Sequence, residues 1–393
     1  MKNLTLFTLI VLYCFSVSIG TQAQEALIKD IRLEQAIRDY LDWPTGKITK
    51  ERIGSLTRLV AFGKNIENLD GLEYATELTH LYLDNNQISD LKPIKDLKNL
   101  ENLSLNGNKI VDVSPLSNLE NLLKLSLDRN EITSIKDLSN LRKLESITFN
   151  FNQIDDISIV ENWKNLTRFN MAFNKISDVS SLSELFNLVG IWIPDNQVSD
   201  ISSLYNLTDL EVLILEKNPV KDIDGINKLT KLVQLNLMDT QIENFNPLSK
   251  LQNVGVLVLR DNEIESIDFL RNMKSIEWLD LRDNHITNIA PLKDLTGLQK
   301  LFLSNNKIYD ITPLSKHHNL YWLLVENNDV NSLWPLYDLN LTDLKYSNRS
   351  KKSSENEVVI NKLKENNVNV NPEEEFNSVF SKAPGWRKKY MGE

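Results

Sequence analysis

Few residues of this chain have the types and the spacing that catalysis requires. The four histidines are His80, His285, His317 and His318, and none has a Ser, Asp or metal-ligand companion at a motif spacing. The nucleophile-elbow pattern G-x-S-x-G, the zinc pattern H-E-x-x-H and the phosphate-binding P-loop are absent from the sequence. The sequence therefore predicts a protein that is not an enzyme and that uses no cofactor and no metal.

A row of carboxylates is the second feature that could do chemistry. Asp239, Asp261 and Asp283 are evenly spaced along the chain, and Arg260 and Arg282 stand next to the last two. One interpretation is a solvated row of ion pairs, each of which contributes little to stability. The other is a rim that selects a basic partner or holds Ca²⁺ through clustered carboxylates. EF-hand loops and glycine-rich calcium repeats, which would favour Ca²⁺, are absent from the sequence.

Composition narrows the class of protein. The chain has 393 residues, of which 41% are hydrophobic and 25% charged, as in ordered globular proteins. Its formal net charge is −10 and no basic stripe is present, so we expect no nucleic-acid partner. These numbers are compatible with one large domain or two ordinary ones.

The segment 1–23 resembles an export signal. Lys2 is the only charge, an apolar run extends from Leu4 to Ile19, and Ala23 offers a cleavage point. The alternative is an uncleaved membrane anchor, but the strictly apolar part is shorter than the ~20 residues of a spanning helix. We expect a secreted, periplasmic or cell-surface protein without a membrane span after cleavage. Cys14, the single cysteine, would leave with the signal.

An internal repeat must position all other side chains. The pattern L-x-x-L-x-L-x-x-N-x-I recurs in thirteen units over residues 56–340, with a constant 22-residue period until the last unit, which is one residue shorter. Apolar residues two apart predict one short strand per unit, with alternate side chains on opposite faces. Asn occupies position 9 in eleven units, where stacked carboxamides can satisfy buried backbone groups, and Lys64 and Thr240 are the exceptions. His317 and His318 fall on the loop between the twelfth and thirteenth units.

The second half of each unit predicts a short turn rather than a long helix. Six prolines share one register position there, which suits the start of a single helical turn: Pro93, Pro115, Pro247, Pro291, Pro313 and Pro335. We therefore expect an α/β leucine-rich-repeat solenoid with a curved parallel β-sheet on the concave face and short 3₁₀ turns on the convex face.

The segment LTRLVAFGKNIENLDGLEYATELTHLYLDNNQISDLKPI (56–94) and the 22-residue period resemble bacterial internalin-type leucine-rich-repeat proteins. Residues 24–55 would form the helical N-terminal cap, through a stripe of Leu33, Ala36, Ile37, Tyr40 and Leu41 and a second helix from Thr49. Residues 341–370 resemble the C-terminal capping repeat, with a helix through Val359, Ile360 and Leu363. The usual immunoglobulin-like domain and LPxTG anchor do not follow. Residues 371–393 form a short aromatic tail that would dock on the last repeat or bind a partner.

The outward strand positions, numbered 3, 5, 7 and 8 in each unit, would line the concave binding face. Large side chains at these positions are the expected contacts to a protein or peptide ligand: Tyr82, Phe151, Phe173, Trp192, Ile214, Val256, Val258, Trp278, Phe302, Trp322 and Leu324. The competing interpretation is cross-strand packing that stabilises the sheet. We favour a ligand because a concave face has no second layer to bury large rings.

The predicted function is therefore an exported, monomeric, non-enzymatic recognition or adhesion module that binds a protein or peptide. One alternative is a structural or envelope spacer protein whose aromatic residues are buried by self-association. Another is a scaffold like the cytosolic phosphatase-regulatory leucine-rich-repeat proteins, which applies if the export signal is not used.

Overall fold

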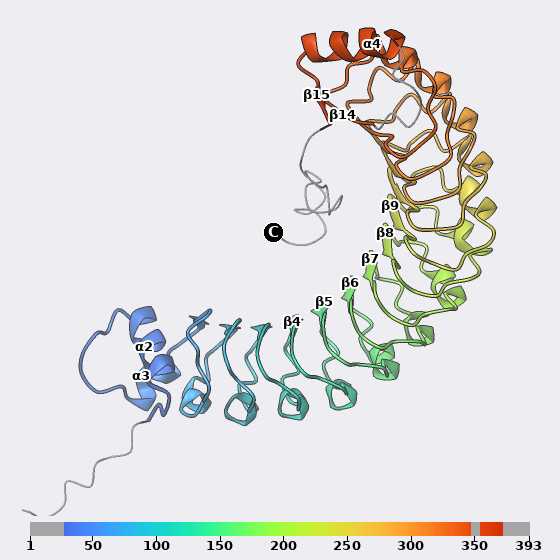
Figure 1. Ribbon diagram of the computed structural model, residues 1–393. Coiled ribbons are helices and arrows are strands. Elements are labelled where there is room, and N and C mark those ends of the chain that lie inside the picture. Colours follow the sequence, from blue (N-terminus) through green and yellow to red (C-terminus); the bar gives the residue numbers. More distant parts are fainter. Residues whose placement is uncertain (1–26, 347–353, 372–393) are drawn as a thin grey trace, which may run out of the picture.

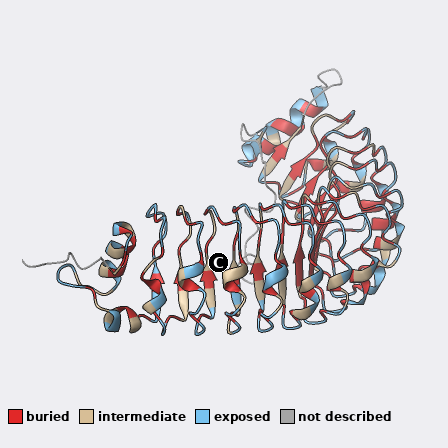
Figure 2. Cartoon of the chain, turned by 90° about the horizontal axis from the view of Figure 1, so that it is seen from below, coloured by how far each residue is buried: buried red, intermediate tan, exposed pale blue. Residues whose placement is uncertain are grey.

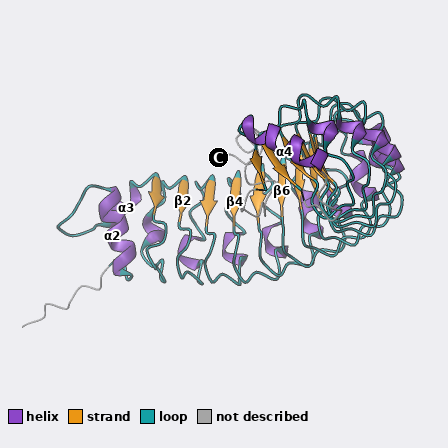
Figure 3. Ribbon diagram, turned by 45° about the horizontal axis from the view of Figure 1, so that its top comes forward, coloured by secondary structure: helices purple, strands orange, loops and turns teal. Residues whose placement is uncertain are grey.

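In the computed structural model, residues 27–346 and 354–371 are described, and they form a single curved solenoid (Figure 1). The predicted signal segment and the tail from residue 372 lie outside the described residues. The strands line the inner side of the arc and the short turns lie on its outer side (Figures 1 and 3). This arrangement confirms the predicted fold class, including the concave sheet and the convex turns.

The described strands form one fifteen-stranded parallel sheet in which spatial order follows chain order. Paired residues are one repeat apart, as for Leu59 with Leu81, so each repeat places one strand beside the last. The strands are β1 (Arg58–Val60), β2 (His80–Tyr82), β3 (Asn102–Ser104), β4 (Lys124–Ser126), β5 (Ser146–Thr148), β6 (Arg168–Asn170), β7 (Gly190–Trp192), β8 (Val212–Ile214), β9 (Gln234–Asn236), β10 (Val256–Val258), β11 (Trp278–Asp280), β12 (Lys300–Phe302), β13 (Trp322–Leu324), β14 (Asp343–Lys345) and β15 (Asn369–Val370).

Each repeat crosses to the outer arm through a short 3₁₀ turn, and the six register prolines lie in the first residues of their turns. The turns are η1 (Leu72–Tyr74), η2 (Lys92–Ile94), η3 (Ser114–Leu116), η4 (Lys136–Leu138), η5 (Ser158–Asn162), η6 (Ser180–Leu182), η7 (Ser202–Asn206), η8 (Ile226–Lys228), η9 (Asn246–Lys250), η10 (Asp268–Leu270), η11 (Ala290–Leu292), η12 (Thr312–Leu314) and η13 (Trp334–Leu336).

Helices close both ends of the sheet. At the N-terminal end, α2 (Ile31–Tyr40) and α3 (Lys50–Gly54) precede β1, and the Thr49 side chain caps α3 as predicted. Tyr40 was expected on the buried stripe of α2, but it is 43% exposed, whereas Leu41 beside it packs against the core. At the C-terminal end, α4 (Ser354–Glu365) leads into β15, which pairs with β14. Among the described residues, no helix has the length and apolarity needed to cross a membrane.

The asparagine ladder forms as predicted. In a typical rung, Asn174 Oδ1 accepts a hydrogen bond from Ile154 N at 3.0 Å, and its Nδ2 donates to Phe149 O at 2.9 Å and Met171 O at 3.2 Å. The carboxamide thus satisfies backbone groups of two neighbouring repeats that are shielded from water. Thr240 interrupts the ladder, because its hydroxyl can only donate one hydrogen bond, to Leu237 O or to Asn262 Oδ1.

Apolar side chains from all repeats form one continuous core. Figure 2 colours the buried residues red along the chain. His317 lies on the connection between η12 and β13, as predicted, but it is fully buried, at a register position that most other repeats give to Leu. Its ring nitrogens lie 3.2 Å from Leu314 O and 3.1 Å from Leu292 O. Burial lowers the pKa of His317, so the ring is held in its neutral form.

Candidate functional site: the concave face

The register of the sheet places the predicted outward residues on the concave face. Strand β10 pairs with β11 so that Val256 lies beside Trp278, while the intervening Leu257 lies beside Leu279 in the core. The same alternation holds along the sheet, so position 3, 5 and 7 side chains form rows across neighbouring repeats. Two apolar clusters lie on these rows, and an ion-pair network and an exposed aromatic stack lie at positions 7 and 8, just beyond the strands.

The first apolar cluster contains Trp192, Val212 and Ile214, with Val189 packed against it. Trp192 lies flat over the strand because position 190 is a glycine: a Cβ there would overlap the indole ring. All three side chains are buried. Strands β7 and β8 therefore carry a preformed apolar floor on the concave side.

The second cluster contains Trp278, Phe302 and Leu324, with Val256 and Trp322 packed against it. Phe302 meets Trp322 edge-to-face at 5.4 Å. Phe302 is 0% exposed and Trp278 only 7% exposed. The expectation that a concave face cannot bury large rings is therefore wrong, because inward curvature brings the outward side chains of adjacent repeats into contact. Val258 is also buried.

Lys300 lies between two tryptophans of this second cluster. Its ammonium is 4.0 Å from the ring centroid of Trp278 and 4.8 Å from that of Trp322, in the position 3 row of the sheet. Burial lowers the pKa of Lys300, while the charge of Asp343 opposes the shift. Lys300 was not singled out from the sequence. The signal was present, because Trp278 and Trp322 occupy the same repeat position one unit before and one unit after it.

The carboxylate row is bridged by an arginine, as the ion-pair interpretation expected. Arg260 Nε lies 3.0 Å from Asp261 and 2.9 Å from Asp283. Partial burial, Asp283 and Asp239 together raise the pKa of Asp261, although Arg260 opposes them. Within the described ranges, no group of three His, Cys, Asp or Glu side chains has the geometry to hold a metal ion.

Arg282 has a different partner from the one expected. It forms an ion pair of 2.6 Å with Asp280, which lies two residues earlier, at the end of β11, and is 2% exposed. Its guanidinium also lies 5.4 Å from the ring centroid of Phe302. Arg282 therefore covers the second apolar cluster instead of joining the acidic rim.

Phe151 and Phe173 form an exposed aromatic stack at position 8. Their rings are 4.2 Å apart and inclined by 9°, and Arg129 lies 4.6 Å from the ring centroid of Phe151. Each phenylalanine has φ of 55°, a left-handed conformation that other repeats give mainly to Gly, Asn or Asp. Their side chains are 40% and 39% exposed. The two phenylalanines therefore have strained backbone conformations and exposed rings, and they do not fill the core.

A pocket of about 200 Å³, lined by polar and apolar groups, lies beside this stack on strands β5 to β7. Asp128, Thr148, Asn150 and Arg168 line it, and Trp192 belongs to its wall. Asp128 accepts a hydrogen bond of 2.7 Å from Asn150 N, and burial raises its pKa despite this bond. The pocket therefore combines hydrogen-bonding groups with one aromatic surface.

Position 7 carries a second side-chain ladder that sequence reasoning did not recognise. Asp84, Asn106, Asp128 and Asn150 each accept a hydrogen bond of 2.7 Å from the position 7 amide of the next repeat. The ladder ends at Ala172, and the next residue in the row, Pro194, has no amide hydrogen to donate. These side chains hold the rim of the polar half in a fixed shape.

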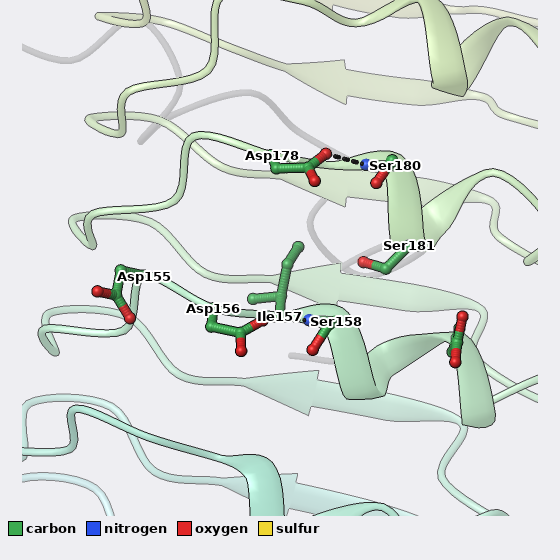
Figure 4. Close-up of a pocket in the computed structure, with 8 residues that line it drawn as sticks. Asp155, Asp156, Ile157, Ser158, Asp178, Ser180 and Ser181 are labelled. Carbon is green, nitrogen blue, oxygen red and sulfur yellow. Dashed lines mark hydrogen bonds between the residues drawn. The ribbon is translucent and has the colours of Figure 1, made fainter.

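The outer arm offers a weaker candidate. A depression of about 200 Å³ near η5 and η6 is lined by acidic and hydroxyl side chains (Figure 4). Asp156 and Asp178 each accept a 2.8 Å hydrogen bond, from Ser158 N and Ser180 N respectively. The bond from Ser158 lowers the pKa of Asp156. These carboxylates therefore serve to begin the 3₁₀ turns.

Tyr82 lies near the N-terminal end of the concave face, apart from both clusters. It meets Phe62 edge-to-face at 6.3 Å, and Arg58 lies 4.8 Å from its ring centroid. The predicted contact residues thus divide into three groups along the arc, separated by polar repeats. Gln234 and Asn236, which are buried, separate the two apolar clusters, as their polar side chains in the ninth unit suggested.

A repeated strand, turn and asparagine ladder define a leucine-rich-repeat protein. The family described as leucine-rich repeats in two copies matches residues 98–140, 208–250 and 274–316. An internalin, InlF, from Listeria monocytogenes is 30% identical, with a TM-score of 0.79 over 82% of this chain and 97% of that chain. The chain belongs to the internalin-type leucine-rich-repeat proteins.

Other solved structures share the fold. Internalin C2 from Listeria monocytogenes is 27% identical, with a TM-score of 0.50 over 59% of this chain and 94% of that chain. A leucine-rich-repeat protein of Leptospira interrogans is 23% identical, with a TM-score of 0.72 over 82% of this chain and 97% of that chain. No curated protein matches the sequence. The fold is that of a protein-binding repeat module.

Proposed function

We propose that this protein is an exported recognition module that binds a protein or peptide ligand on its concave face without catalysis. The observation that carries the proposal is the exposed stack of Phe151 and Phe173. Two large rings at left-handed backbone positions that face solvent lower the stability of the folded chain. Their exposed apolar surface offers a contact for a binding partner. The adjoining polar pocket supplies groups that orient a ligand.

The remaining predicted contacts take a different role in this proposal. Trp192, Ile214, Trp278, Phe302, Val258 and Leu324 form the rigid floor, since their side chains are buried. Tyr82, Phe151, Phe173, Val256 and Trp322 keep accessible surface for a ligand. Asp239, Asp261 and Asp283, of which Arg260 bridges the last two, favour a ligand with basic groups at the rim. Export through residues 1–23, a monomeric state and action outside the cytoplasm remain part of the proposal.

The test uses a phage-displayed library of random peptides selected on the mature protein. The dissociation constants of selected peptides are then measured for the wild type, for the double variant Phe151→Asn/Phe173→Asn, and for Phe186→Ser. Phe186 is 59% exposed but lies beyond η6, away from the sheet, so it is a matched control. We expect at least about tenfold weaker binding for the double variant alone, because a hot spot costs about 2 kcal/mol or more. Equal binding by all three proteins would refute the proposed site.

Sedimentation separates the proposal from the self-associating spacer. The proposal predicts a monomer at all accessible concentrations for both the wild type and the double variant. Concentration-dependent oligomers that disappear in Phe151→Asn/Phe173→Asn would assign the stack to self-association instead.

A further inference from the structure

Lys300 has a largely buried side chain, and the charge that acts on it, Asp343, lies two strands away. Its side chain is 8% exposed, and its ammonium forms no hydrogen bond or ion pair with any described residue. The nearest acidic side chain in the same row is Asp343, two strands away. Its oxygens accept hydrogen bonds from Thr342 Oγ1 at 2.8 Å and from Asn369 Nδ2 at 3.2 Å. Aromatic faces offset part of the burial of a cation, but they accept none of its three N–H bonds.

The same cluster contains an indole donor without an acceptor. Trp278 is 7% exposed, and its Nε1 is buried without a hydrogen-bond partner among the described residues. This N–H belongs to the ring that lies 4.0 Å from the Lys300 ammonium. In the same position 3 row, Gln234 is 3% exposed and its Nε2 also lacks a partner within the described part of the chain. Buried donors are nearly always paired in folded proteins, so the unpaired indole N–H of Trp278 beside the Lys300 ammonium indicates a missing acceptor.

We propose that Lys300 and Trp278 form a carboxylate-binding subsite of the concave face. The inference rests on the proposed function, because it names the chemistry of one ligand group. A carboxylate has one negative charge and two acceptor oxygens, which match an ammonium and an indole N–H. The acidic rim at position 8 lies further along the strands, so the ligand carries an acidic group at β11–β13 and basic groups at the rim.

The carboxylate can come from a ligand or from this chain. Glu373, Glu374 and Glu375 follow β15, which is three strands, or about 14 Å, from Lys300. Both sources present the same chemistry to the subsite. The experiment therefore includes a full-length variant in which all three glutamates are replaced by glutamine.

The test follows the tryptophan indole N–H signals by nuclear magnetic resonance in the mature protein, with the Trp278 signal assigned from Trp278→Phe. N-acetylglutamate is added, and N-acetylglutamine serves as the uncharged control. We expect a downfield shift of the Trp278 signal with the glutamate derivative only. Lys300→Met should weaken the response by about tenfold or more, since hydrogen bonds to charged groups are strong, and Lys300→Arg should retain part of it.

A response that appears only in the triple glutamine variant would support the subsite and identify the chain itself as the source of the carboxylate. The absence of a response in both the wild type and the triple variant would overturn the subsite, as would an equal response to N-acetylglutamine. The titration does not involve Phe151 or Phe173. A negative titration together with retained peptide binding would therefore remove the subsite and leave the proposed function intact.

Discussion

The double substitution Phe151→Asn/Phe173→Asn should leave the free energy of unfolding within about 1 kcal/mol of the wild type. Loss of the stacked contact costs about 0.5–1.5 kcal/mol, and loss of the contact with Arg129 costs about 0.5–1 kcal/mol. Against this, left-handed backbone costs bulky residues about 1–2 kcal/mol each, and asparagine relieves part of that strain. These two contributions to the free energy of unfolding nearly cancel.

Urea unfolding followed by circular dichroism measures this balance. The midpoint should move little and the slope should stay unchanged, because the surface exposed on unfolding is the same. Phe186→Ser provides the comparison for an exposed phenylalanine outside the concave face. A loss of more than about 3 kcal/mol, or a changed slope, would show that the stack holds the repeats together. The reasoning from exposure and strain to ligand binding would then fail.

Four further substitutions test the packing that supports the site. In urea unfolding, Asn174→Ala should lower the free energy of unfolding by about 2–4 kcal/mol, because it leaves Ile154 N and a carbonyl without hydrogen-bond partners. Thr240→Asn should raise the free energy of unfolding, because it restores the missing ladder residue. Equal effects of the two substitutions would contradict the ladder. Burial lowers the pKa of His317, so the free energy of unfolding should be highest above about pH 6.5 and should fall as the pH drops below that value. In urea titrations at several pH values, His317→Leu should make the free energy of unfolding less dependent on pH. Trp278→Ala should cost about 3–5 kcal/mol, and an unchanged melting temperature would contradict its burial.

Much of the fold could be predicted because repeat proteins encode each contact locally. The 22-residue period fixes which residues pair across strands, as Leu59 and Leu81 do. The ladder asparagines and the register prolines specify turns within a few residues of themselves. The caps were recognisable because a helix that closes a sheet edge carries an apolar stripe, although the stripe predicted one buried residue too many at Tyr40.

The burial and contacts of individual concave-face side chains could not be predicted from the repeat pattern. Exposure on the concave face depends on curvature, which accumulates over many repeats and has no local signal. Phe302 and Val258 therefore looked exposed in the sequence and are buried in the structure. The burial of His317 was not foreseen because histidine is rare at a core leucine position. Lys300 was overlooked because its two aromatic neighbours are each a whole repeat away.

Photo-crosslinking of a selected peptide tests the central claim most directly, because it reports which face of the solenoid the ligand touches. A peptide that carries a photoreactive group is irradiated with the mature protein, and the modified residues are identified by mass spectrometry. The account predicts adducts on concave positions of β5 to β7, near Phe151 and Phe173. Adducts confined to the outer arm, near Phe186 or Trp334, would contradict it.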